Sequence, residues 1–120
     1  MYTKEQKEKL EKVMEVFGDY MKESPYVEVV WSEKIGYIFL NVDKKHQDVD
    51  FIIPLDCAET LCGRLCYEVA QDVLMLTGSD HAVRGADPLE KAEIWRRLEP
   101  YLEQLPEYRY LAEKMFTSEE

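Results

Sequence analysis

Three short segments that alternate apolar and polar residues constrain the fold of this chain most strongly. In residues 26–32, 37–43 and 49–53, every second residue is apolar and these residues point to one side, as in a β-strand with one buried face. Short polar loops separate them, so consecutive segments can close as antiparallel hairpins. The sequence therefore predicts a three-stranded antiparallel meander.

The register of the two hairpins follows from the constant index sum of facing residues in an antiparallel pair. Pairing Trp31 with Ile38 leaves a four-residue loop, in which Gly36 takes a left-handed conformation. Pairing Val42 with Val49 leaves a six-residue loop. Both hairpins then close with one apolar set on a common face: Val27, Val29, Trp31, Ile38, Leu40, Val42, Val49, Phe51 and Ile53.

Helix signals lie on both sides of the meander. A capping box at Thr3 to Gln6 begins the first helix, which ends before Pro25. Asp56 begins the second helix, and Gly78 is a natural stop for it. Asp87 and Pro88 begin a third, which Pro100 should kink or split. We expect a single α+β domain over residues 1–120, with helices 3–24, 57–77, 88–105 and 107–116, the last two or three of which pack on the sheet.

Composition and charge exclude several classes of function. An apolar content of 46% supports a folded core, and the net charge of −10 disfavours binding to nucleic acids and anionic membranes. The N-terminus is too charged for a signal peptide, and no segment has the apolar length of a membrane span. Three closely spaced cysteines are a poor disulfide framework. We expect a small cytoplasmic protein of bacterial type, kept soluble by its acidity.

The order of helix, three antiparallel strands and helix from Thr3 to Gly78 is similar to that of double-stranded-RNA-binding domains. Those domains bring a lysine-rich helix N-terminus to the RNA phosphates. At that position this chain has Asp56, Cys57, Ala58 and Glu59. The resemblance therefore implies a topology but no RNA binding.

The three cysteines divide into two kinds. Cys62 and Cys66 fall on the apolar stripe of the helix 57–77, where a free cysteine acts as a small core residue. A zinc site would need further ligands from Cys57, His46 or His81, none of which belongs to a paired metal motif. The sequence thus predicts no metal and no cofactor.

Two small groups remain as alternatives for chemistry. Cys57 lies in the first turn of a predicted helix, a position that can make a thiol reactive. His81 and Arg84 share the polar loop 79–87 with carboxylates, and together they could support acid–base work or hold an anion. A small enzyme or ligand binder at either place is one alternative function, and an acidic mimic of a nucleic acid is another.

The reverse face of the predicted sheet is the leading candidate for function. A sheet face open to water is mostly polar, whereas this one is rich in aromatic and aliphatic residues. Either the C-terminal helices or a second protein should cover it. We therefore expect a non-enzymatic protein-binding module, possible as a homodimer, whose interface is formed by this face or by the C-terminal helices. The interface candidates are Tyr26, Val30, Tyr37, Phe39 and Ile52.

Overall fold

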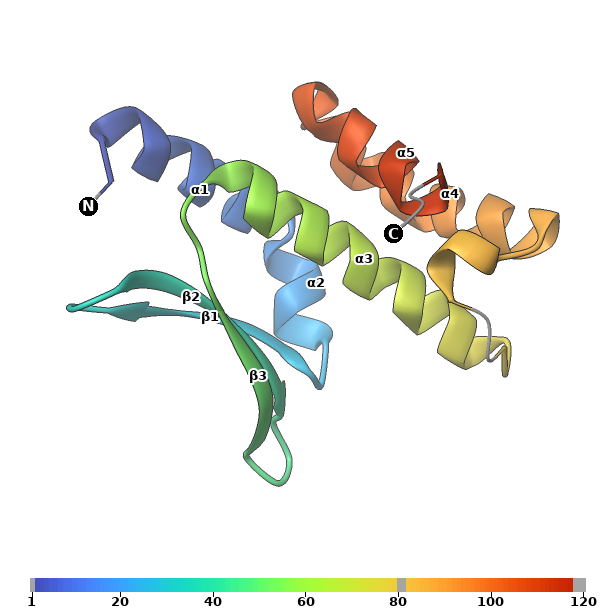
Figure 1. Cartoon of the computed structure of the whole chain (residues 1–120), viewed down its shortest axis with the longest axis horizontal. Helices are drawn as coiled ribbons and strands as arrows, with labels where there is room; N and C mark the ends of the chain where they lie inside the picture. The colour runs from blue at the N-terminus through green and yellow to red at the C-terminus, as the bar shows by residue number, and fades with distance from the viewer. Residues whose placement is uncertain (1, 80–81, 118–120) are drawn as a thin grey trace. The chain divides into compact units, whose positions relative to one another are not determined.

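The computed structural model describes residues 2–79 and 82–117. Helices precede and follow a three-stranded antiparallel sheet of strand order β1-β2-β3 (Figure 1), so the predicted α+β class and element order are confirmed. The elements are α1 (Lys4–Val16), α2 (Gly18–Glu23), β1 (Val27–Ser32), β2 (Gly36–Asp43), β3 (Asp48–Pro54), α3 (Ala58–Leu76), α4 (Pro88–Leu102) and α5 (Arg109–Thr117), with short 3₁₀ helices η1 (Val83–Gly85) and η2 (Pro106–Tyr108).

Contacts between Cα atoms divide the chain into two compact units, Met1–Leu61 and Cys62–Glu120. The first unit holds α1, α2, the sheet and the start of α3, and the second holds the rest of α3 and the later helices. The single domain expected over residues 1–120 stays a prediction. No helix in the described ranges combines the length and the apolarity that a membrane span requires.

The first helix begins at the predicted capping box. The backbone N–H of Gln6 donates to the Thr3 hydroxyl (3.0 Å), and the backbone N–H of Thr3 donates to the Gln6 side chain (2.8 Å). The helix expected over residues 3–24 is divided at Phe17, whose backbone (φ −92°, ψ 11°) departs from regular helical values. Three side chains around this break are fully buried: Leu10, Val13 and Phe17.

The predicted register of the first hairpin is wrong by one residue. Val30 lies opposite Ile38 in place of Trp31, and the ladder continues to Ser32 opposite Gly36. The turn therefore has three residues instead of four. The Ser32 hydroxyl accepts from two backbone N–H groups inside the turn (3.3 and 3.4 Å), and Gly36 closes it at φ 100°. Three-residue hairpin turns end on a residue with positive φ, so the turn chemistry overrides the pairing that alternation predicted.

The second hairpin contains an extra residue that alternation does not reveal. Val42 pairs with Val49 as predicted, but the register then shifts, because Asp50 has no counterpart in β2. This is the arrangement of a β-bulge. The other predicted pairs are each displaced by one residue, which puts Leu40 opposite Ile52.

The apolar stripe predicted on the helix 57–77 is buried in α3 except at its end. Cys62 and Cys66 are both completely buried, as expected of small core residues. Leu76, whose helical spacing also places it on this stripe, is 70% exposed. It is the last residue of α3, and Gly78 follows with a left-handed backbone (φ 71°) that ends the helix as predicted.

In the second unit, α4 begins at the predicted cap. The backbone N–H of Glu90 donates to the Asp87 carboxylate (2.8 Å), and the backbone N–H of Asp87 donates to the Glu90 carboxylate (2.9 Å). The helix expected over 88–105 ends at Leu102, with Pro100 inside its last turn. The short η2 and α5 then occupy the segment predicted as the last helix.

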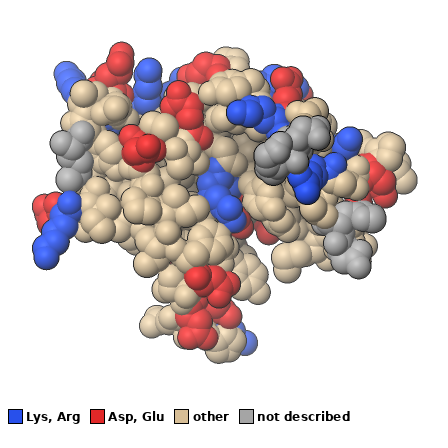
Figure 2. All heavy atoms as spheres, in the orientation of Figure 1, with Lys and Arg blue, Asp and Glu red and all other residues tan. Residues whose placement is uncertain are grey.

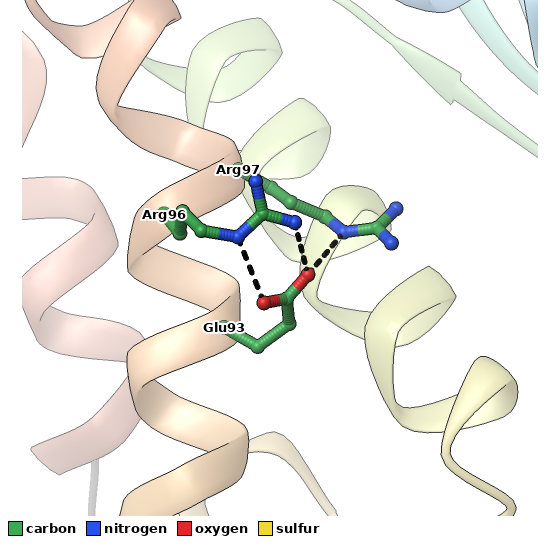
Figure 3. A network of polar contacts seen from close by, with 3 residues as sticks. All are labelled: Glu93, Arg96 and Arg97. Atoms are coloured by element: carbon green, nitrogen blue, oxygen red, sulfur yellow. Dashed lines mark hydrogen bonds and ion pairs between the residues drawn. The ribbon is translucent and has the colours of Figure 1, made fainter.

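An ion-pair network lies on α4 (Figure 3). The Glu93 carboxylate accepts from Nε of Arg96 (2.9 Å), from a terminal nitrogen of Arg96 (2.6 Å) and from Nε of Arg97 (3.0 Å). The hydrogen bonds from Arg96, and then those from Arg97, lower the pKa of Glu93 to about 2. Glu93 therefore stays ionised in acid that protonates ordinary glutamates.

Candidate protein-binding surface on the sheet

One face of the sheet meets α1. The Tyr37 hydroxyl donates to the Glu11 carboxylate (2.9 Å), and the Lys7 ammonium lies 5.5 Å from the centre of the Trp31 ring. Phe39 lies on this face and is completely buried. Figure 1 shows α1 and α2 on this side of the sheet. We call it the helix-side face, and it carries Val27, Val29, Trp31, Tyr37, Phe39, Phe51 and Ile53.

The opposite face, which we call the outer face, is apolar and accessible in part, since Ile38 and Val42 in its central strand are buried. Its strand residues alternate with those of the helix-side face. Ile52 is 57% exposed, Val49 is 50% exposed and Tyr26 is 42% exposed. A sheet face that meets water normally carries polar residues, so this one is unusual. The outer face consists of Tyr26, Val30, Ile38, Leu40, Val42, Val49 and Ile52, with Glu28 as its acid.

The five predicted interface residues do not share one face. Tyr26, Val30 and Ile52 lie together on the outer face. Tyr37 and Phe39 lie on the helix-side face, where the first contacts Glu11 and the second has no exposed surface. A one-residue slip moves every side chain of a strand to the other face, and this is why the two aromatics of β2 were misplaced.

The same one-residue difference in register changes the predicted face of the residues in the central strand, β2. Alternation predicts Ile38, Leu40 and Val42 on the face against the helices, whereas in the structure they lie between Val30 and Ile52 of the neighbouring strands. The signal that could have placed them is local. Ser32 and Gly36 stand at the spacing of a three-residue turn, whose geometry sets the register.

Acidic residues gather at one end of the sheet. The β2–β3 hairpin carries Asp43, Asp48 and Asp50, and Figure 2 shows the acidic surface at this hairpin. Nδ1 of His46 lies 2.9 Å from the Asp43 carboxylate, and this hydrogen bond lowers the pKa of Asp43. Asp43 pairs with Asp48 next to the outer-face pair of Val42 and Val49, so these two aspartates lie at the end of the sheet on its helix-side face.

Cys57 lies just before α3, in a polar contact. Its Sγ is 3.3 Å from the Thr60 hydroxyl, which donates to the Asp56 carboxylate (2.9 Å). The bond from Thr60, followed by one from Cys57, lowers the pKa of Asp56. Cys57 is half-buried, whereas Cys62 and Cys66 are buried. Among the described residues, no group of three or more histidine, cysteine or acidic side chains is placed to hold a metal ion.

The structure describes only part of the second candidate group, His81 and Arg84. Arg84 lies exposed in η1, and His81 lies outside the described residues. A small enzyme or ligand binder that uses Cys57, or His81 with Arg84, stays a prediction. The acidic mimic of a nucleic acid stays a prediction as well.

Comparison with known proteins adds no family to this picture. No protein-family model, no curated protein and no solved structure matches the chain.

Proposed function

We propose that the chain is a protein-binding module that docks a partner on the outer face of its sheet. The supporting observation is the exposure of large apolar side chains on that face, with Ile52 at 57% and Val49 at 50%. Exposed apolar side chains that gather on one face often mark protein–protein interfaces in soluble proteins. Docking would remove them from water.

The negative charge of the chain favours a partner with a basic surface. Glu28 lies on the outer face, and the chain as a whole carries a net charge of −10. A partner with an apolar centre and a basic margin is complementary to this face. Attraction between the opposite charges mainly raises the rate of association, so binding should weaken as salt is added.

The test uses affinity enrichment with three matched forms of the chain. Ile52→Asp places a charge on the exposed part of the outer face that β3 contributes. Leu89→Asp places the same charge on α4, where Leu89 is 83% exposed and belongs to another surface. We expect a specific set of proteins to be captured by the unchanged chain and by Leu89→Asp, and to be lost with Ile52→Asp.

Direct binding measurements then decide the proposal. A captured protein is purified and titrated by calorimetry, and it should bind Leu89→Asp with the same affinity as the unchanged chain. It should bind Ile52→Asp roughly tenfold more weakly or worse, because docking would bury the new charge without a partner. Equal affinity for both variants would show that the partner docks elsewhere. Circular dichroism establishes beforehand that both variants are folded.

A further inference from the structure

A hollow of about 440 Å³ lies within the first unit, where α1, α2 and β1 contribute to its lining. Its volume is within the range of roughly 300–1,000 Å³ that pockets for small ligands have. The apolar part of its lining consists of Met14 from α1, Met21 from α2, and Val27 and Val29 from β1. The hollow is therefore large enough for a small molecule, and much of its wall favours an apolar one.

The apolar residues of the hollow are more deeply buried than most of the charged ones. Val27 is 1% exposed, and the other three apolar residues are half-buried. By contrast, Lys22 and Glu28, which also line the hollow, are exposed. A ligand that enters would thus cover the apolar side chains with an apolar body and keep a polar end at the charged margin.

Two lysines give this margin an excess of positive charge. The half-buried Lys44 donates from its ammonium to the C=O of Met21 (2.9 Å), near the end of α2. This hydrogen bond holds the ammonium at the peptide bond that joins Met21 to Lys22, and it uses one of three N–H donors. With Glu28, the lining carries two positive charges and one negative charge, in a chain of net charge −10. One carboxylate on a ligand would balance them.

We propose that the hollow binds an amphipathic monocarboxylate, a small molecule with one carboxylate group and an apolar body. The carboxylate accepts hydrogen bonds from the ammonium groups of Lys22 and Lys44. The apolar body lies against Met14, Met21 and Val29. Methionine side chains are flexible and polarisable, so they adapt to apolar bodies of different shape. The carboxylate therefore contributes more to selectivity than the outline of the apolar body does.

Other kinds of ligand fit these charges less well. A cation would be repelled by the two lysines. A neutral amide or alcohol would form hydrogen bonds about half as strong as those of a carboxylate. A phosphate group carries about 1.5–2 negative charges at neutral pH, and Glu28 would oppose the excess. The balance of charge thus favours a single carboxylate.

This site is separate from the proposed docking of a partner on the outer face. Val27 and Val29 belong to the helix-side face, and the two methionines belong to α1 and α2. Ile52 lies on the outer face, so Ile52→Asp should leave ligand binding unchanged. A failure of one proposal is therefore distinguishable from a failure of the other.

Carbon-13 NMR of methyl-labelled methionines tests the site with octanoate as the probe. Octanoate should shift the methyl signals of Met14 and Met21 and leave the signal of Met75 in place. Met75 is 66% exposed and belongs to the second unit, so it reports non-specific association. Octanamide has the same alkyl chain without the charge, and it should bind roughly tenfold more weakly because it forms no charge-assisted hydrogen bonds.

Two matched lysine variants test the role of the charge. Lys22→Gln should weaken octanoate binding roughly three- to tenfold and leave octanamide binding unchanged. Lys12 is exposed on α1 and is not among the described residues that line the hollow. Lys12→Gln removes the same charge and should change neither affinity. Methionine spectra without ligand establish that both variants keep the fold.

Three results would overturn the proposal. The first is the absence of shifts at Met14 and Met21 with octanoate at millimolar concentrations. The second is a shift of Met75 as large as theirs, which would show non-specific association. The third is equal affinity for octanoate and octanamide, which would show that the lysines do not bind the carboxylate.

Discussion

Phe39 and Phe51 stack on the helix-side face of the sheet, with ring centroids 6.3 Å apart and ring planes 23° apart. They share a face because Asp50 is an extra residue in β3. Without it, Phe51 would lie opposite Leu40 on the outer face. One bulged residue therefore decides which apolar side chains of β3 lie on the helix-side face and which lie on the outer face.

The two faces should respond differently to the loss of an apolar side chain. We expect Phe39→Ala to lower the free energy of unfolding by about 3–5 kcal/mol, because the ring is completely buried. Ile52→Ala should change it by less than about 1 kcal/mol, because that side chain is mostly exposed. Urea unfolding followed by circular dichroism measures both. A larger loss for Ile52→Ala would mean that the faces are assigned the wrong way round.

The three-residue turn can be tested with two glycines of opposite backbone geometry. Gly36 has φ 100°, where a Cβ is strained, so Gly36→Ala should destabilise the chain by about 1–2 kcal/mol. Gly63 lies inside α3 with no atom within 4 Å of an added Cβ. Gly63→Ala should therefore stabilise the chain by roughly 0.5–1 kcal/mol. Thermal unfolding compares the two, and equal effects would contradict this assignment of the turn.

The three cysteines should differ in how readily a thiol reagent reaches them. A thiol reagent should modify half-buried Cys57 in the folded chain and reach Cys62 and Cys66 only when the chain unfolds. Replacing either buried cysteine by alanine should cost about 1–2 kcal/mol of stability and leave partner binding intact. Mass spectrometry of modified peptides reports the first result, and denaturant unfolding the second. Equal reactivity of all three thiols would refute the buried positions.

The ion-pair network on α4 should lower the pH at which the Glu93 carboxyl group titrates. Its pKa of about 2 lies below the ordinary value of 4.5, so ionised Glu93 favours the folded state. This contribution is complete above the pKa of the unfolded chain, falls as the pH drops below about 4.5, and is lost as the pH passes through about 2. Carbon-13 NMR of the side-chain carboxyl measures the midpoint. Replacing Arg96 by glutamine should raise that midpoint, whereas a midpoint near 4.5 in the unchanged chain would mean that the network does not persist in solution.

Patterns that act over a few residues could be predicted from the sequence. The capping boxes at Thr3 and Asp87, the stop at Gly78 and the burial of Cys62 follow from local hydrogen bonding or helical spacing, and the structure has all four. The order of elements followed from these signals together with the alternation of the strands.

The composition of the candidate surface could not be predicted in the same way. Alternation fixes which residues of one strand share a side, but it does not say which side of the next strand joins them. The turn that ends at Gly36 and the bulge at Asp50 decide this. Tyr26 and Ile52 were placed correctly relative to each other, while Phe39 was exchanged with its neighbour Leu40.

The bulge in β3 also limits how the chain can aggregate. A free strand edge can recruit other chains into growing sheets, and natural proteins oppose this with bulges and with charges on the edge. In β3, Asp48 and Asp50 supply the charges, and Asp50 is also the extra residue that forms the bulge. Pairing of further chains with β3 is thereby disfavoured, so that a contact between molecules at this edge does not continue into a fibril.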